Sequence, residues 1–174
     1  MDSFPAIEID KVKAWDFRLA NINTSECLNV AYGVDANYLD GVGVSITSIV
    51  LNNRHINLDF YIIADVYNDG FFQKIAKLAE QNQLRITLYR INTDKLQCLP
   101  CTQVWSRAMY FRLFAFQLLG LTLDRLLYLD ADVVCKGDIS QLLHLGLNGA
   151  VAAVVKDVEP MQEKAVSRLS DPEL

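Results

Sequence analysis

Short apolar runs alternate along the first half of this chain with longer segments in which apolar residues recur at helical spacing. We expect strands over residues 28–34, 58–64 and 84–88, and helices over residues 39–51 and 71–79. In the first of these helices, Val42, Ile46, Ile49 and Val50 fall on one face. Because parallel strands need long crossover connections, this alternation predicts an α/β fold, with a mostly parallel central sheet flanked by helices.

The second half and the beginning of the chain are less regular. After a polar loop over residues 92–103, we expect a helix over 104–119, a short strand over 125–129, a short helix that Asp138 caps and that runs to residue 143, and a buried strand over 150–155. Residues 1–26 show no sustained period and predict a leading arm with a helical turn. The expected organisation is this arm followed by one domain over residues 27–174.

The charge balance narrows the kinds of partner that the protein can bind. With 174 residues, of which 52% are apolar, the chain can bury one substantial core. Its formal charge of -5 and its lack of Lys and Arg clusters argue against nucleic-acid binding, which needs a basic surface. An acidic protein that handles phosphate groups needs a cation, so any phosphate-bearing ligand is expected to bind together with a metal ion.

The amino-terminal residues and the apolar stretches bear on location. Residues 1–10 carry three acidic side chains and no basic one, whereas a secretory signal begins with a basic region followed by an apolar one. Arg112, Asp124 and Asp130 are among the residues that interrupt the longest apolar stretches, which fall short of the roughly 20 residues needed to span a bilayer. The sequence therefore predicts a cytoplasmic protein.

Two carboxylates, Asp130 and Asp132, stand two residues apart where an apolar run ends. Residues 35–38 are also polar and follow the first predicted strand, and ligands of parallel sheets bind at the carboxyl ends of strands. The simpler interpretation is a pair of solvated turn residues. Apolar neighbours on both sides favour burial instead, and a divalent cation offsets the cost of burying unpaired carboxylates. We therefore predict a Mg²⁺ or Mn²⁺ site that neutralises a departing diphosphate.

The same five residues, 130–134 (Asp-Ala-Asp-Val-Val), also fit the nucleophile motif of haloacid-dehalogenase-like phosphatases. In those enzymes the motif follows the first strand of the fold. Here about three strand–helix units precede it. A phosphatase is therefore the second enzyme hypothesis, behind a transferase.

Three segments together resemble glycosyltransferase family 8, whose members are retaining enzymes of the GT-A fold. They are residues 30–38 (Val-Ala-Tyr-Gly-Val-Asp-Ala-Asn-Tyr), 110–113 (Tyr-Phe-Arg-Leu) and 127–132 (Leu-Tyr-Leu-Asp-Ala-Asp), and the likeness covers residues 28–159. The resemblance implies a Rossmann-like nucleotide-diphospho-sugar transferase of lipopolysaccharide core biosynthesis. It further implies UDP-glucose as donor, Mg²⁺ or Mn²⁺, a lipopolysaccharide core oligosaccharide as acceptor, and peripheral contact with the cytoplasmic face of the bacterial inner membrane through parts outside this chain.

The resemblance also implies a set of residues that contact the nucleotide sugar. These are Gly33, Val34, Asp35, Asn37, Tyr38, Arg112, Asp130 and Ala131. Asp35 would accept the uracil imide hydrogen, and Tyr38 would stack on the base. The backbone of Gly33 would come close to the nucleotide because glycine has no Cβ. For Tyr38, the alternative role is a packing residue at a helix start.

Catalytic and metal roles are implied in the same way. Arg112 would hold oxygens of the donor sugar in its planar fork, Asp130 would contact the transferred sugar, and Asp157 would be a further sugar-site carboxylate. Asp130 and Asp132 would be the metal ligands. The alternatives are a solvated helix residue for Arg112 and a surface ion pair for Asp157.

The family pattern continues with an Asp-Gln-Asp segment and a histidine that completes the metal shell, and this chain contains neither. The resemblance therefore implies that the chain is an N-terminal portion of a longer enzyme. Two carboxylates alone would hold a metal ion weakly. A non-catalytic sugar-nucleotide-binding module is the hypothesis outside the enzyme class.

Overall fold

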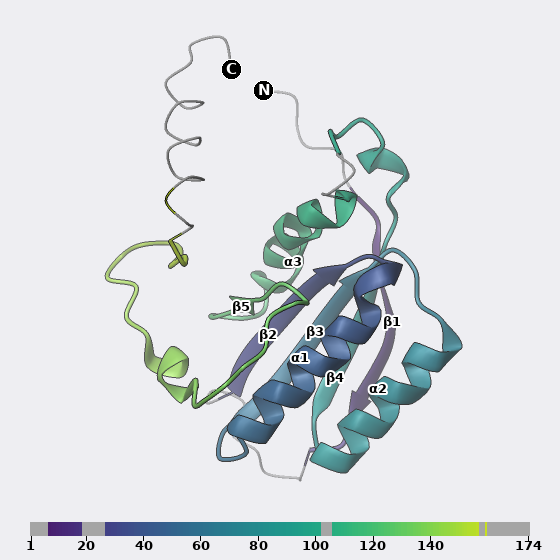
Figure 1. Ribbon diagram of the computed structural model, residues 1–174. Coiled ribbons are helices and arrows are strands. Elements are labelled where there is room, and N and C mark those ends of the chain that lie inside the picture. The colour runs from purple at the N-terminus through teal and green to yellow at the C-terminus, as the bar shows by residue number, and fades with distance from the viewer. Residues whose placement is uncertain (1–6, 19–26, 102–105, 157–158, 160–174) are drawn as a thin grey trace. The chain divides into compact units, whose positions relative to one another are not determined.

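A computed structural model describes residues 7–18, 27–101, 106–156 and 159 of the chain (Figure 1). In these residues, five strands form one sheet in the order β1-β4-β3-β2-β5. The strands are β1 (Ile9–Asp16), β2 (Cys27–Val34), β3 (Asn57–Ala64), β4 (Arg85–Ile91) and β5 (Leu127–Tyr128). The pairs among β2, β3, β4 and β5 are parallel, and β1 pairs with β4 antiparallel. The predicted α/β fold with a mostly parallel sheet is confirmed.

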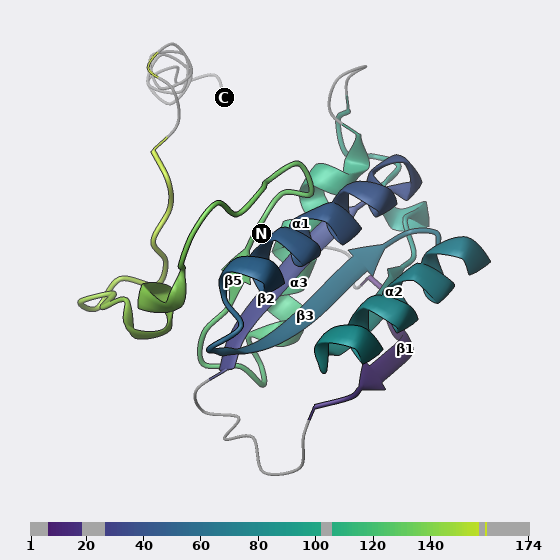
Figure 2. The same cartoon turned by 60° about the horizontal axis from the view of Figure 1, so that its bottom comes forward.

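Helices cover both faces of the sheet because the central strands are apolar on both faces. In β3, Phe60 and Ile62 belong to the core beneath α1 (Leu39–Asn52) and α2 (Asp69–Asn82), which lie side by side on one face (Figures 1 and 2). Tyr61 and Ile63 belong to the core of the other face, which α3 (Phe111–Leu119) covers. Since successive side chains of a strand point to opposite faces, such a strand is stable only when both are covered.

The two helices on the first face agree with the predicted patterns. In α1 the residues predicted for one face, among them Val42, Ile46 and Ile49, are all buried. In α2 the Asn68 side chain accepts a hydrogen bond from the Phe71 amide (2.7 Å), which satisfies one of the free amides of the first turn. The predicted strand–helix order of residues 28–91 is thus confirmed.

The leading arm contains a strand that the sequence analysis did not predict, and its described residues, 7–18, contain no helical turn; residues 1–6 and 19–26 lie outside the described residues. Residues 9–16 form β1, the antiparallel edge strand that pairs with β4. The register shifts between Lys11 and Lys13, so Ile9 packs with the core under α3 whereas Trp15 packs with the core under α1 and α2. A bulge of this kind breaks the period of two that identifies a strand in a sequence.

Two predictions after residue 100 also need correction. The helix predicted over 104–119 is a 3₁₀ turn at Arg107–Tyr110 followed by α3, and residues 102–105 lie outside the described residues. Residues 150–155, predicted as a buried strand, form no strand, and Val151, Val154 and Val155 are fully or almost fully exposed. An apolar run becomes a buried strand only when it pairs with another strand, and residues 145–156 contain none.

Candidate functional site

The ends of β2 and β5 bring two predicted polar segments to the same edge of the sheet. Ala31 of β2 pairs in parallel with Tyr128 of β5, and the Leu129 amide donates to the Ala31 carbonyl (3.0 Å). Asp35 follows β2 directly, and Asp130 follows β5 after one residue. Both carboxylates therefore lie at the carboxyl edge of the sheet, where ligands of parallel sheets bind.

The turn after β2 fixes the carboxylate of Asp35 and leaves its neighbours exposed. Asp35 accepts hydrogen bonds from the Asn37 amide (3.0 Å) and from the Ser106 hydroxyl (2.7 Å). Asn37 is exposed, and the Tyr38 ring is 54% exposed. An anchored carboxylate beside an open aromatic face can recognise a planar base by one hydrogen bond and one stacking contact.

Ser106 is a site residue that the sequence analysis did not identify. Its hydroxyl donates to Asp35 and also accepts from the Ala108 amide (3.3 Å) at the start of the Arg107–Tyr110 turn. A serine just before a helical segment is a recognisable cap. The pattern alone does not show that the cap reaches a residue that lies 71 positions earlier.

Gly33 has a packing role that differs from the predicted one. A Cβ at this position would lie 2.7 Å from the Cβ of Phe111 and 2.7 Å from the hydroxyl of Tyr128. Glycine is therefore needed here for α3 and β5 to approach β2. The contact of the Gly33 backbone with a nucleotide stays a prediction.

Arg112, Tyr128 and Asp130 form one polar cluster at the carboxyl edge. The Arg112 guanidinium donates to a carboxylate oxygen of Asp130 (3.0 Å) and lies 5.3 Å from the centre of the Tyr128 ring. Burial raises the pKa of the Tyr128 hydroxyl, and the charge of Arg112 opposes that rise. The ring and the carboxylate hold the guanidinium at the site, although its side chain is 45% exposed.

The predicted burial of the two aspartates is wrong. The Asp130 side chain is 57% exposed and Asp132 is also exposed, whereas Ala131 between them is buried. The turn, closed by a bond from the Val133 amide to the Asp130 carbonyl (3.2 Å), directs alternate side chains to opposite sides. Because both carboxylates are exposed, there is no cost of burying them that a metal ion would have to offset. Both carboxylates are nevertheless accessible to a metal ion.

The chemistry of this donor pair fits Mg²⁺ or Mn²⁺. In the described part of the chain no cluster of three or more His, Cys, Asp or Glu side chains could hold a metal ion. Mg²⁺ nevertheless binds commonly through one or two carboxylates and completes its shell with water and substrate phosphate oxygens. Asp130 and Asp132 would supply two such ligands, and the Asp130 carboxylate also accepts a hydrogen bond from Arg112.

Three of the predicted site residues, Val34, Ala131 and Asp157, have no side chain that the structure shows to be exposed at the site. Val34 and Ala131 are buried, so any contact that they make with a nucleotide sugar would come from their backbone atoms. Asp157 lies outside the described residues. Its proposed role as a sugar-site carboxylate stays a prediction.

Asp65 adds a carboxyl group to this edge that the sequence analysis did not single out. It follows β3, the strand next to β2, and its side chain accepts from the Val66 amide (2.9 Å). Burial raises the pKa of the Asp65 carboxyl, and the negative charge of Asp35 adds to the rise. The edge is therefore acidic at three neighbouring strand ends, those of β3, β2 and β5.

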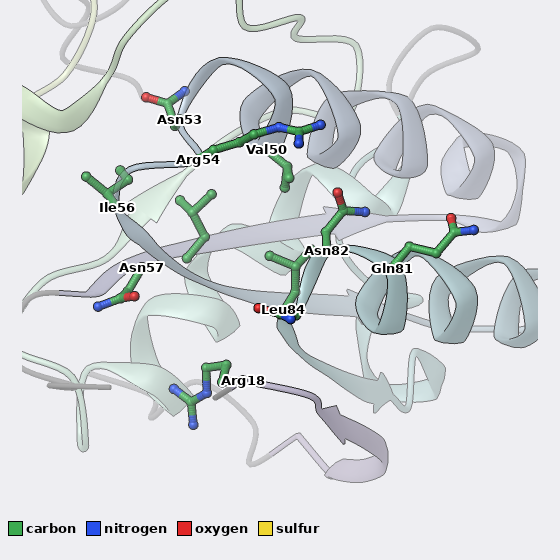
Figure 3. A pocket seen from close by; sticks show the side chains of 11 residues that line it. Arg18, Val50, Asn53, Arg54, Ile56, Asn57, Gln81, Asn82 and Leu84 are labelled. Carbon is green, nitrogen blue, oxygen red and sulfur yellow. The ribbon is translucent and has the colours of Figure 1, made fainter. Parts of the chain in front are cut away.

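A cavity of about 400 Å³, lined by both polar and apolar residues, lies at the opposite edge of the sheet (Figure 3). Arg54, Asn57 and Asn82 line it where α1 and α2 end and β3 begins. Arg18 also lines it, but its guanidinium forms an ion pair with the buried carboxylate of Asp59, with 3.1 Å between Nη1 of Arg18 and Oδ1 of Asp59. This cavity is at the amino ends of the parallel strands and is separate from the candidate site.

Gly41 sets how closely the turn that carries the two aspartates packs against α1. A Cβ on Gly41 would lie 3.0 Å from the carbonyl oxygen of Ala131, whereas a Cβ on Gly43 would meet nothing within 4 Å. We expect Gly41→Ala to displace this turn and weaken Mn²⁺ binding by about 10-fold, the usual scale for residues that support metal ligands. Equilibrium binding of Mn²⁺ to the complete protein, with Gly43→Ala as control, checks this. Equal affinities for the two variants would contradict it.

Comparison with known proteins gives relatives of one kind. The sequence profile of glycosyl transferase family 8 matches residues 29–172. The chain is 39% identical over 163 residues to a lipopolysaccharide 1,2-glucosyltransferase of Escherichia coli, covering 94% of the chain and 46% of that protein. It is 38% identical over 145 residues to a lipopolysaccharide 1,3-galactosyltransferase of Salmonella typhimurium, covering 83% of the chain and 43% of that protein. The chain therefore spans less than half the length of these curated relatives.

A solved structure supports the fold. The galactosyltransferase LgtC in complex with donor and acceptor sugar analogues superposes with a TM-score of 0.57 at 19% identity, covering 66% of this chain and 41% of LgtC. At this identity the likeness bears on the fold alone. The GT-A fold that the resemblance implied is confirmed.

Proposed function

Because the chain belongs to glycosyltransferase family 8, we propose that the protein that contains it transfers glucose from UDP-glucose, with retained configuration, to a sugar of the lipopolysaccharide core. One observation of the structure carries this proposal. The anchored carboxylate of Asp35 and the paired carboxylates of Asp130 and Asp132 lie at the ends of two neighbouring parallel strands. One edge thus offers a base-binding turn and a phosphate-binding turn.

The first turn would bind the uridine. A carboxylate has about four lone-pair positions, so Asp35 can accept the uracil imide hydrogen in addition to the bonds from Asn37 and Ser106. The exposed ring of Tyr38 is available to stack on the base. Because Ser106 and the Asn37 amide already orient the carboxylate, little side-chain entropy is lost when the nucleotide binds.

The second turn would bind the diphosphate and the sugar. Asp130 and Asp132 would hold Mg²⁺ or Mn²⁺, which when bound supplies positive charge to the departing UDP. Arg112 contacts Asp130 in the structure, and its exposed fork can move onto oxygens of the donor sugar. The ring of Tyr128 keeps the guanidinium within reach of both partners.

Acceptor and location belong to the same proposal. The acceptor is a lipopolysaccharide core sugar, and the protein works at the cytoplasmic face of the inner membrane through peripheral contacts. Within the residues that the structure covers, none of the helices has the length and apolar character of a membrane span. Glucose is proposed over galactose because the relative matched over 94% of the chain is named a glucosyltransferase, although galactosyltransferases are also among the relatives.

A donor assay with the complete protein tests this function. We expect transfer to a core oligosaccharide acceptor with UDP-glucose and Mn²⁺ to be at least about 10-fold faster than with UDP-galactose, a difference of roughly 1.4 kcal/mol in transition-state binding. The product linkage, examined by NMR, should keep the α configuration of the donor. A faster reaction with UDP-galactose would reassign the donor. Release of phosphate from an aryl phosphate at a comparable rate would favour the phosphatase hypothesis instead.

A further inference from the structure

The last turn of α1 binds the chain segment that follows the two aspartates. We call Ser48, Asn52 and Asn53 the α1 clamp. The Cys135 amide donates to the Ser48 hydroxyl (2.9 Å), and the Asn52 side chain donates to the Cys135 carbonyl (3.1 Å). In both views of the ribbon, this segment runs beside α1 (Figures 1 and 2).

Asn53 is the centre of the clamp and is fully buried. Its amide nitrogen donates to the carbonyls of Ile49 (2.9 Å) and Gly137 (3.3 Å), and its amide oxygen accepts from the Ile139 amide (2.8 Å). One buried side chain thus joins the end of α1 to two points of the loop after residue 134. Removing it would leave buried backbone groups without partners, which is costly.

The segment between the clamp and the aspartates has little packing of its own. Asp132, Val133 and Val134 are all exposed. Their position must therefore come from the residues at either end of the segment. Upstream, the Leu129 amide is bonded to the Ala31 carbonyl of β2, and downstream the first fixed residue is Cys135.

The segment that joins the turn to the clamp is short. Along α1, the step from Gly41 to Ser48 covers about 10 Å at 1.5 Å per residue. Gly41 faces the Ala131 carbonyl and Ser48 binds Cys135, so four chain steps, which reach at most about 14 Å, must cover a similar length. The Val133 amide closes the turn on the Asp130 carbonyl, so only residue 134 separates this turn from Cys135, and we expect a shift of Cys135 to reach Asp132.

From these contacts we propose that Asn53, supported by Ser48 and Asn52, is a positioning residue for the metal-binding turn. It acts through residues 135–139 and fixes the turn whose two carboxylates, Asp130 and Asp132, would hold a divalent cation. The proposal rests on the proposed function, because it gives this pair a metal to bind. Asn53 follows the last residue of α1, at the end of the helix that lies away from Asp35 and Tyr38, and it has no proposed contact with the sugar or the nucleotide.

The test measures Mn²⁺ affinity of the complete protein in the presence of UDP, by the electron paramagnetic resonance signal of free Mn²⁺. Asn53→Ala should weaken binding by about 10-fold, and Ser48→Ala, which leaves the fold less disturbed, by a smaller factor. Asn82→Ala is the matched control, because Asn82 also bonds the carbonyl four residues earlier near a helix end (Leu78, 2.9 Å) but does not contact the 135–139 loop. It should leave the affinity unchanged.

Amide hydrogen exchange gives a second readout that needs no metal ion. In the metal-free protein, exchange at Cys135 and Ile139 should be faster in Asn53→Ala than in Asn82→Ala. Equal Mn²⁺ affinity in Asn53→Ala, Ser48→Ala and Asn82→Ala, with the unsubstituted protein binding Mn²⁺, would overturn the positioning role alone. Failure of the unsubstituted protein to bind Mn²⁺ with UDP would overturn the proposed function and, with it, this role.

Discussion

Replacing Asp132 by Asn in the complete protein should lower the rate of sugar transfer by about 10²- to 10³-fold, the usual cost of losing one group that stabilises charge on a leaving oxygen. The reason is specific to this position. Asp132 is exposed, and among the described residues its carboxylate has neither a hydrogen-bond nor an ion-pair partner, so the substitution breaks no contact of the fold. The loss should appear in kcat and in the Mn²⁺ requirement, with the midpoint of thermal unfolding unchanged.

A matched substitution separates this effect from a change in surface charge. Asp124 is exposed in the turn before β5 and lies six residues before Asp130 in the chain. Asp124→Asn removes the same charge without touching the site, and transfer should stay within about twofold of the unsubstituted rate, as for most surface substitutions. Transfer by Asp132→Asn at the Asp124→Asn rate would contradict the role assigned to Asp132.

Gly33→Ala should lower the free energy of unfolding by about 2 kcal/mol, because overpacking a tight site costs roughly 1–3 kcal/mol. The added methyl group would meet the Cβ of Phe111 and the hydroxyl of Tyr128 at 2.7 Å, and a carbon next to the backbone cannot move away by a change of rotamer. Displacement of Phe111 would also move Arg112, the next residue of α3. Thermal unfolding should shift by about 4 °C or more, together with a loss of transfer.

The control for Gly33→Ala is the same substitution in open space. Gly43 lies on α1, where an added Cβ meets nothing within 4 Å. Alanine has the higher helix propensity, so Gly43→Ala should raise stability by up to about 1 kcal/mol. If Gly33→Ala and Gly43→Ala unfolded at the same temperature, the close packing of α3 and β5 on β2 would be refuted.

The central half of the fold was predictable because its signals are local. The strands and helices between residues 27 and 91 each carry a complete apolar pattern, since each is buried along its length by its neighbours. β1 was missed because its bulge places Ile9 and Trp15 on opposite faces. Residues 150–155 carry a strand-like pattern, but the described residues of their own unit, 145–156 and 159, contain no strand with which they could pair.

The candidate site was predictable in its position but not in its environment. Topology alone places Asp35 and Asp130 at one edge, because β2 and β5 run parallel. The exposure of Asp130 and Asp132 depends on the direction of a turn, which flanking apolar residues do not determine. Contacts between distant residues, such as Ser106 with Asp35, leave no signal in the sequence of either partner.

Supporting residues were the hardest to predict. The types of Gly41, inside α1, and Asn53, the residue that follows α1, do not show their roles, and each is explained by a neighbour more than eighty positions later in the chain. Gly41 and Ser48 lie on α1 and Asn53 follows its last residue, so this helix and its end support the segment at 130–139 from one side while β2 supports Leu129 from the other. Substitutions in a helix that makes no proposed ligand contact can thus change metal binding.

Binding of UDP-glucose to the complete protein by isothermal titration calorimetry, with and without Mn²⁺, tests the account most directly. If Asp130 and Asp132 hold a cation against the diphosphate, Mn²⁺ should raise the affinity for UDP-glucose by at least about 10-fold, and UDP-glucose should raise the affinity for Mn²⁺ by the same factor. An affinity for UDP-glucose that is the same with and without Mn²⁺ would contradict the assignment of these carboxylates as the metal site.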